Sequence, residues 1–136
     1  MAAQARETDA LVLNCTEHGE SDVIVTLFCR DVGRLTAIAK GAKKSKRRFV
    51  NKLELFSFLH ITYEQKANRS LAFFADAELH TSFLHLRQNL ELYSVASVIR
   101  EFLLIGVREN EPDMHIFRLS LWALHSLDQQ QPPMSV

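Results

Sequence analysis

The sequence is poor in glycine, proline, cysteine and long apolar runs. Four glycines and three prolines among 136 residues exclude collagen-like and low-complexity chains, and 47% hydrophobic with 24% charged residues is typical of a globular protein. Two cysteines are too few for a disulfide framework, which favours a reducing compartment. No run approaches the ~20 apolar residues of a membrane span, and the N-terminus lacks signal-peptide features. We therefore expect a cytoplasmic protein without a membrane segment.

Motifs of the common enzyme classes are also absent. The sequence contains no GxxxxGK[ST], GxGxxG, GxSxG or HExxH pattern. Cys15 and His18 lie three residues apart, but no nearby Asn or Asp completes a nucleophilic site, and both cysteines lie in apolar runs typical of a core. The six histidines are scattered, which predicts no metal site. We expect no enzymatic activity, no metal and no cofactor.

Positive charge is concentrated in one segment, although the 16 basic and 16 acidic residues cancel overall. Between residues 34 and 52 there are eight basic side chains and no acidic one: Arg34, Lys40, Lys43, Lys44, Lys46, Arg47, Arg48 and Lys52. Such a segment can be a solvated loop, but its like charges repel one another unless a partner neutralises them. We therefore predict that it binds a polyanion, with nucleic acid as the first candidate.

Hydrophobic periodicity divides the chain into a strand-rich and a helical part. Alternating apolar runs predict strands over residues 10–16, 23–30, 34–40, 55–65 and 71–79. Three- and four-residue spacing then predicts helices over about 86–107 and 113–128. Five short antiparallel strands followed by helices indicate a small β-barrel with a helical extension. The strand count alone fits an OB-fold, an SH3-like barrel or a small sandwich.

Aromatic side chains accompany the basic segment. Phe49 lies within it, and the adjoining strands carry Phe56, Phe58, Tyr63, Phe73 and Phe74. A charged groove beside aromatic rings suits single-stranded nucleic acid, because every phosphate is anionic and every base can stack. Most of the nine phenylalanines must fill the core of so small a barrel, so we expect at most two to contact bases. We include Phe49 with the basic residues in the predicted site.

Several short motifs together resemble the N-terminal part of RecO, the bacterial recombination mediator of the RecFOR pathway. They are Ala10-Leu-Val-Leu, Gly19-Glu-Ser-Asp22, Gly33-Arg-Leu and the run from Ala39 to Ser45. The resemblance implies an OB-fold over residues 1–80 that binds single- and double-stranded DNA. Residues 81–136 would be a partial helical domain of two helices, truncated relative to the family. Cys29, Leu55 and Val98 stand where the family usually has Thr, Pro and Tyr.

The resemblance also implies activities and partners. RecO-like proteins anneal complementary strands, contact RecR and single-stranded-DNA-binding protein, and help to load RecA during DNA repair. The DNA-binding role would fall on the basic residues from Arg34 to Arg48, whereas Gly19-Glu-Ser-Asp22 would be a structural turn. Two rival functions remain: a barrel whose basic loop docks an acidic partner tail, and a barrel that binds structured RNA.

The predicted helices are apolar around much of their circumference. Leu103, Leu104 and Ile105 are consecutive, and consecutive helical positions are about 100° apart, so one covered face cannot hold all three. We therefore expect an exposed apolar patch and self-association through the helical face.

Overall fold

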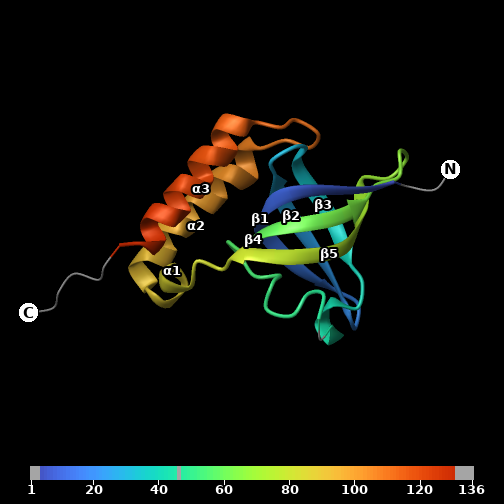
Figure 1. Ribbon diagram of the computed structural model, residues 1–136, viewed down its shortest axis with the longest axis horizontal. Helices are drawn as coiled ribbons and strands as arrows, with labels where there is room; N and C mark the ends of the chain where they lie inside the picture. Colours follow the sequence, from blue (N-terminus) through green and yellow to red (C-terminus); the bar gives the residue numbers. More distant parts are fainter. Residues whose placement is uncertain (1–3, 46, 131–136) are drawn as a thin grey trace, which may run out of the picture.

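Alternating buried and exposed side chains form the five strands of a closed barrel, with helices packed at one end (Figure 1). The computed structural model describes residues 4–45 and 47–130. The strands are β1 (Ala5–His18), β2 (Asp22–Cys29), β3 (Gly33–Ala39), β4 (Phe58–Glu64) and β5 (Leu71–Thr81). β1 begins five residues before the predicted start. β4 begins three residues late, because the chain turns at Phe56, whose φ is 71°.

One parallel pairing closes the barrel. The strand order is β1-β2-β3-β5-β4, with β4 hydrogen-bonded back to β1. Thr36, Ala37 and Ile38 of β3 run parallel to Leu71, Ala72 and Phe73 of β5, whereas the other four pairs are antiparallel. The prediction of antiparallel strands throughout is therefore wrong for β3 and β5. The five-stranded OB-type barrel followed by helices is confirmed.

Side-chain caps set where the helices begin. The predicted helix over 86–107 is divided into α1 (Leu84–Gln88) and α2 (Leu90–Gly106), because the Asn89 side chain accepts a hydrogen bond from the Leu92 amide and caps α2. In the same way Asp113 accepts from the Ile116 amide and caps α3 (Met114–Asp128). The short element η1 (Ala42–Lys44) is a 3₁₀ turn after β3.

The helices share a second core with the outer wall of the barrel. One cluster fills the barrel interior, and a separate cluster lies between the strands and the helices. In the second cluster Phe28 of β2 meets Phe117 of α3 edge to face, with ring centroids 5.3 Å apart. Arg87 donates to the Leu55 and Ser82 carbonyls, and Arg100 donates to the Leu13 carbonyl, so both guanidinium groups fasten helices to the barrel. The domain boundary at residues 80 and 81 stays a prediction; β5 ends at Thr81.

A close approach fixes the turn between β2 and β3 beneath the helices. Gly33 has φ 73°, and a Cβ atom there would lie 2.5 Å from the Glu111 carbonyl oxygen in the connection between α2 and α3. Only glycine fits both the positive φ and the contact. The turn is therefore held against the helical segment.

Part of the helical surface is apolar and exposed, as the helix pattern predicts. Leu103 is buried, Leu104 is half-buried and Ile105 is 82% exposed. Phe102 of α2 and Leu119 of α3 are 72% and 58% exposed, and both line a groove of about 460 Å³ between the two helices. No helix among the described residues is both long and apolar enough to cross a membrane.

We expect this groove to mediate self-association, because exposed apolar patches commonly mark interaction surfaces. Light scattering at micromolar concentration should give a mass above that of the monomer. Replacing both Phe102 and Leu119 by Glu should restore the monomer mass, whereas Ser94→Glu, which adds a charge to an exposed position of α2, should not. A parent chain that stays monomeric would contradict the expectation.

The two cysteines behave as core residues. Cys29 is fully buried, and the Cys15 thiol donates to the Leu53 carbonyl oxygen at 3.3 Å. Burial raises the pKa of the Cys15 thiol to about 11, and burial raises the pKa of Cys29 as well. The thiolate is the reactive form of cysteine, and the raised pKa values leave little of it near neutral pH. Neither thiol is therefore activated as a nucleophile.

Alkylation with iodoacetamide tests this assignment. At pH 8 we expect Cys15 of the folded protein to react about two orders of magnitude more slowly than an ordinary thiol, because its thiolate fraction is that much smaller. The rate should rise about tenfold per pH unit towards pH 11. Both cysteines should react rapidly after unfolding in guanidinium, and equal rates for folded and unfolded protein would contradict the burial.

Candidate nucleic-acid interface

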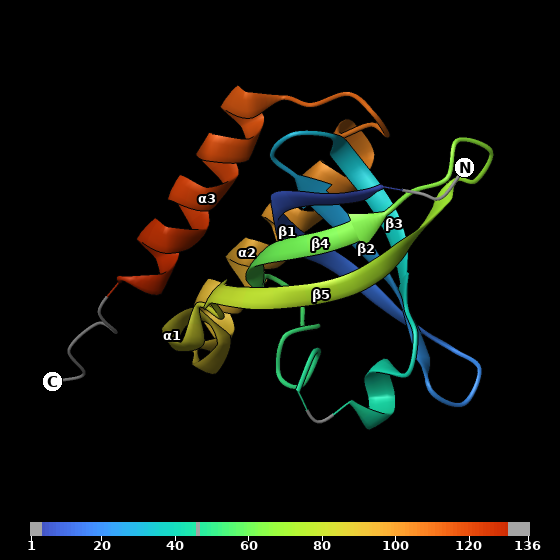
Figure 2. The ribbon, with the colours of Figure 1, turned by 45° about the vertical axis from the view of Figure 1, so that its right-hand side comes forward.

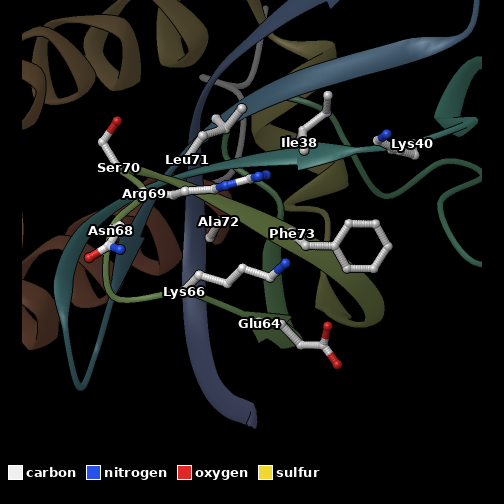
Figure 3. A pocket seen from close by; sticks show the side chains of 10 residues that line it. All are labelled: Ile38, Lys40, Glu64, Lys66, Asn68, Arg69, Ser70, Leu71, Ala72 and Phe73. Atoms are coloured by element: carbon white, nitrogen blue, oxygen red, sulfur yellow. The ribbon is translucent and has the colours of Figure 1, made fainter. Parts of the chain in front are cut away.

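A groove of about 650 Å³ lies between the end of β3 and the β4–β5 hairpin (Figure 3). Ile38 and Lys40 line it from the side of β3. The hairpin and the start of β5 contribute Glu64, Lys66, Asn68, Arg69, Ser70, Leu71, Ala72 and Phe73. The hairpin lies at the end of the barrel away from the helices (Figure 1). In OB-folds the face of strands 2 and 3 together with this hairpin loop is where oligonucleotides bind.

Strand alternation and the parallel pairing build the groove. Leu35, Ala37 and Ala39 of β3 point into the barrel, which leaves Ile38 and Lys40 on the outer face. In β5 the Phe74 ring is buried, and the Phe73 ring next to it is 37% exposed. Because Ile38 pairs with Phe73, the parallel ladder places one exposed aromatic ring beside Lys40.

The groove is positively charged. Lys40, Lys66 and Arg69 line it with a single carboxylate, Glu64. Within the part of the chain that the structure describes, none of these three cations forms an ion pair. In Figure 3 the Lys66 side chain extends from the hairpin towards Phe73, and the Arg69 side chain extends towards Ile38. Cations and an exposed ring in one groove are the two components that bind the phosphates and bases of a single strand.

The described residues of the loop that follows Gly41 do not line the groove. This basic loop, described over residues 42–45 and 47–52, lies beneath the barrel (Figure 2). The Arg48 guanidinium donates to the Ala75 and Lys40 carbonyls at 3.3 and 3.4 Å, and the Lys52 Nζ donates to the Ala77 carbonyl at 2.6 Å. Ala75 and Ala77 follow the short parallel ladder, where β5 no longer pairs with β3. Arg48 and Lys52 therefore satisfy carbonyl oxygens at the open edge of β5, which gives both side chains a structural role.

The other cations of the basic loop do not all have the same environment. Lys43 lies 3.2 Å from the Glu17 carboxylate and donates to the Gly19 carbonyl. Asp22 accepts from the Gly41 amide at 2.8 Å, which joins the β1–β2 turn to the start of the loop. Lys44 and Arg47 are exposed and form no ion pair with any described residue, whereas Lys46 lies outside the described residues.

Arg34 lies apart from the rest of the predicted site. It occupies the outer face of β3 like Lys40, but six residues earlier, which is about 20 Å along an extended strand. Its end of β3 contacts the helical segment, because the Arg34 amide donates to the Arg108 carbonyl. The structure therefore separates Arg34 from the other cations.

Phe49 is buried and is not a base-stacking residue. It is 3% exposed and packs edge to face on Phe74, with ring centroids 5.1 Å apart, so that it closes the lower end of the barrel interior. The Arg48 guanidinium carbon lies 5.1 Å from the centre of the Phe49 ring. The buried ring therefore cannot stack on a base in this structure, which argues against the predicted DNA contact of Phe49. Phe56, Tyr63 and Phe74 are likewise buried.

Comparison with known proteins establishes the family. A sequence model of the family "Recombination protein O N terminal" matches residues 1–83, which is more than half of the chain. The chain belongs to the RecO family. It is 36% identical over 129 residues to the DNA repair protein RecO of Syntrophobacter fumaroxidans, covering 95% of this chain and 51% of that protein. The DNA repair protein RecO of Myxococcus xanthus is 36% identical over 125 residues, covering 92% and 51%. The chain spans about half the length of these RecO relatives.

Sequence reasoning missed Lys66 and Arg69 in this RecO chain and did not single out Phe73. Lys66 and Arg69 belong to a hairpin that the sequence predicts only as a turn, and Phe73 is one of several aromatic candidates. The signal that could have identified Lys66 and Arg69 as groove residues is their position just before the apolar run from Leu71 to Phe74. A count of basic residues along the sequence does not single them out, because the segment between residues 34 and 52 contains eight basic residues.

A pair of lysine variants tests the structural role assigned to Lys52. Lys52→Ala should lower the free energy of unfolding by about 1–2 kcal/mol, because it leaves the Ala77 carbonyl without its charged donor. Lys44→Ala should change that free energy by no more than about 0.5 kcal/mol, since the side chain is exposed. Urea denaturation followed by circular dichroism measures both. Equal stability of the two variants would contradict the role assigned to Lys52.

Proposed function

We propose that this chain is the DNA-binding part of a RecO-type recombination mediator and that the groove beside β3 binds single-stranded DNA. The observation that carries the proposal is the exposed Phe73 ring in a groove lined by Lys40, Lys66 and Arg69. Membership of the RecO family supports a role in DNA repair and recombination.

The groove suits both parts of a single strand. The cations attract phosphates without regard to sequence, and the ring offers one base a stacking surface. Lys44 and Arg47 of the basic loop supply exposed positive charge outside the groove, where a longer single strand or a duplex backbone can bind. Binding to two strands in this way would bring complementary DNA together for annealing.

The partners are proposals from the family resemblance. We propose that the chain acts with RecR and single-stranded-DNA-binding protein and assists the loading of RecA, without enzymatic chemistry of its own. A barrel that only docks an acidic tail would need the cations but not the aromatic ring. The exposed Phe73 therefore favours DNA over that alternative.

Fluorescence anisotropy with a labelled oligothymidylate at several salt concentrations tests the groove. Lys66→Ala combined with Arg69→Ala should weaken binding and reduce the magnitude of the log K against log salt slope by about 1.4, at ~0.7 per phosphate contact. Phe73→Ala should weaken binding by about 1–3 kcal/mol and leave the slope unchanged, because stacking releases no counterion. Arg118→Ala, on the exposed side of α3, is the matched control and should bind as the parent does.

Competitors separate the alternatives in the same assay. Unlabelled single-stranded DNA should displace the probe at lower concentration than an RNA duplex or an acidic peptide of equal charge. Displacement by the acidic peptide at equal or lower concentration, with Phe73→Ala binding like the parent, would favour the tail-docking function. Normal DNA binding by the Lys66, Arg69 variant would move the site away from the groove.

A further inference from the structure

Two histidines and an aspartate meet on the outer face of the barrel, where β4 lies between β1 and β5 (Figure 2). The Asp9 Oδ1 atom is 2.8 Å from His60 Nδ1 and 3.0 Å from His80 Nε2. One ligand atom from each of the three residues lies within 4.8 Å of the other two. The cluster lies on the outer wall near α3, far from the groove: His80 is seven residues, about 23 Å of extended strand, from Phe73 on β5.

Strand register brings the three side chains together. Asp9 of β1 is the direct partner of His60 of β4 in the antiparallel ladder. On the other side of β4, Phe58 pairs with Thr81 and Leu59 with Leu79, which leaves His80 as the extra residue of a β-bulge. Bulges turn a side chain out of its regular direction and occur next to functional sites. Here the bulge is what allows His80 to reach Asp9.

The surroundings hold both imidazoles in place. The Glu7 carboxylate lies 3.5 Å from His60 Nε2, the ring nitrogen that does not face Asp9. A carboxylate on the far nitrogen is the usual outer partner of a metal-ligating histidine, because it fixes the tautomer and the ring orientation. The His80 ring lies 4.7 Å from the ring of Phe58, tilted by 36°, so its rotation is restricted as well.

We propose that Asp9, His60 and His80 bind a divalent metal ion of the Zn²⁺ type. Two imidazole nitrogens and one carboxylate oxygen form a donor set that suits such ions, and it contains neither cysteine nor enough oxygen atoms for Ca²⁺. Ligand atoms ~2.1 Å from a tetrahedral Zn²⁺ are about 3.4 Å apart. The separations of 2.8 and 3.0 Å between Asp9 Oδ1 and the two histidine nitrogens would reach that value after small rotations of the side chains.

The ion would join three strands and retain an open coordination position. Asp9, His60 and His80 come from β1, β4 and β5, so one ion would cross-link the wall of the barrel. His80 also lines a cavity of about 400 Å³ with Phe58, Trp122 and His125. This cavity leaves room for water or for a fourth donor beside the site.

Calorimetric titration of the tag-free, chelator-treated chain with ZnCl₂ at pH 7.5 tests the proposal. We expect one Zn²⁺ per chain and, with Co²⁺ as the probe, the visible absorption of a tetrahedral site. Asp9→Asn and His80→Ala should each lower the affinity at least tenfold, and Glu7→Gln about tenfold through His60. His115→Ala is the matched control, because it removes an exposed imidazole of α3 and should leave the affinity unchanged.

Thermal unfolding gives a second readout. Zn²⁺ at a hundred times its Kd should raise the folding equilibrium constant about a hundredfold in the parent and have little effect on His80→Ala. Mg²⁺ should not compete, because it prefers oxygen ligands. The circular dichroism spectra of His80→Ala and Glu7→Gln should match that of the parent chain. This control separates loss of Zn²⁺ binding from loss of the fold. Absence of saturable Zn²⁺ binding, or equal losses in His115→Ala and His80→Ala, would show that the cluster is only a hydrogen-bonded surface group.

Discussion

The three-residue parallel ladder between β3 and β5 is the constraint on which the rest of the structure depends. It closes the barrel, places Ile38 against Phe73, and so creates the groove at the end of β3. Its shortness has an equally important consequence. Beyond Phe73 no strand among the described residues pairs with β5 on that side. The basic loop supplies Arg48 and Lys52 to its carbonyl oxygens, and Phe49 closes the barrel beneath.

We therefore propose two uses for the positive charge of this chain. Some cations of the basic loop stabilise backbone carbonyls, and a charged donor used in this way costs stability when it is removed. Other cations line the groove or remain exposed, and in the proposed function they would attract a polyanion with little cost to the fold. A strongly basic segment in a sequence indicates a polyanion partner, but only the position of each side chain shows which charges can reach it. Lys43 belongs to the first group, since it donates to the Gly19 carbonyl, and the Glu17 carboxylate lies 3.2 Å from its Nζ atom.

Local pattern predicted more of the fold than of the site. Alternation and helical spacing predicted the five strands and the helical segment, because those signals depend on near neighbours. The parallel pairing of Thr36 with Leu71 joins distant segments, so no local period contains it. For the same reason, Phe49 and Phe73 look alike in the sequence, although one is 3% and the other 37% exposed. The histidines that meet Asp9 are 51 and 71 residues away from it, which is why they appear scattered.

The central claim is that DNA binds in the groove formed by the β3–β5 ladder and the hairpin. Backbone amide chemical shifts of the ¹⁵N-labelled chain, followed during titration with an oligothymidylate of about 12 nucleotides, test it most directly. The account predicts the largest shifts at Ile38, Lys40 and residues 66–73, with smaller shifts at Lys44 and Arg47. Shifts confined to the basic loop or to the helices, with the hairpin unaffected, would contradict it.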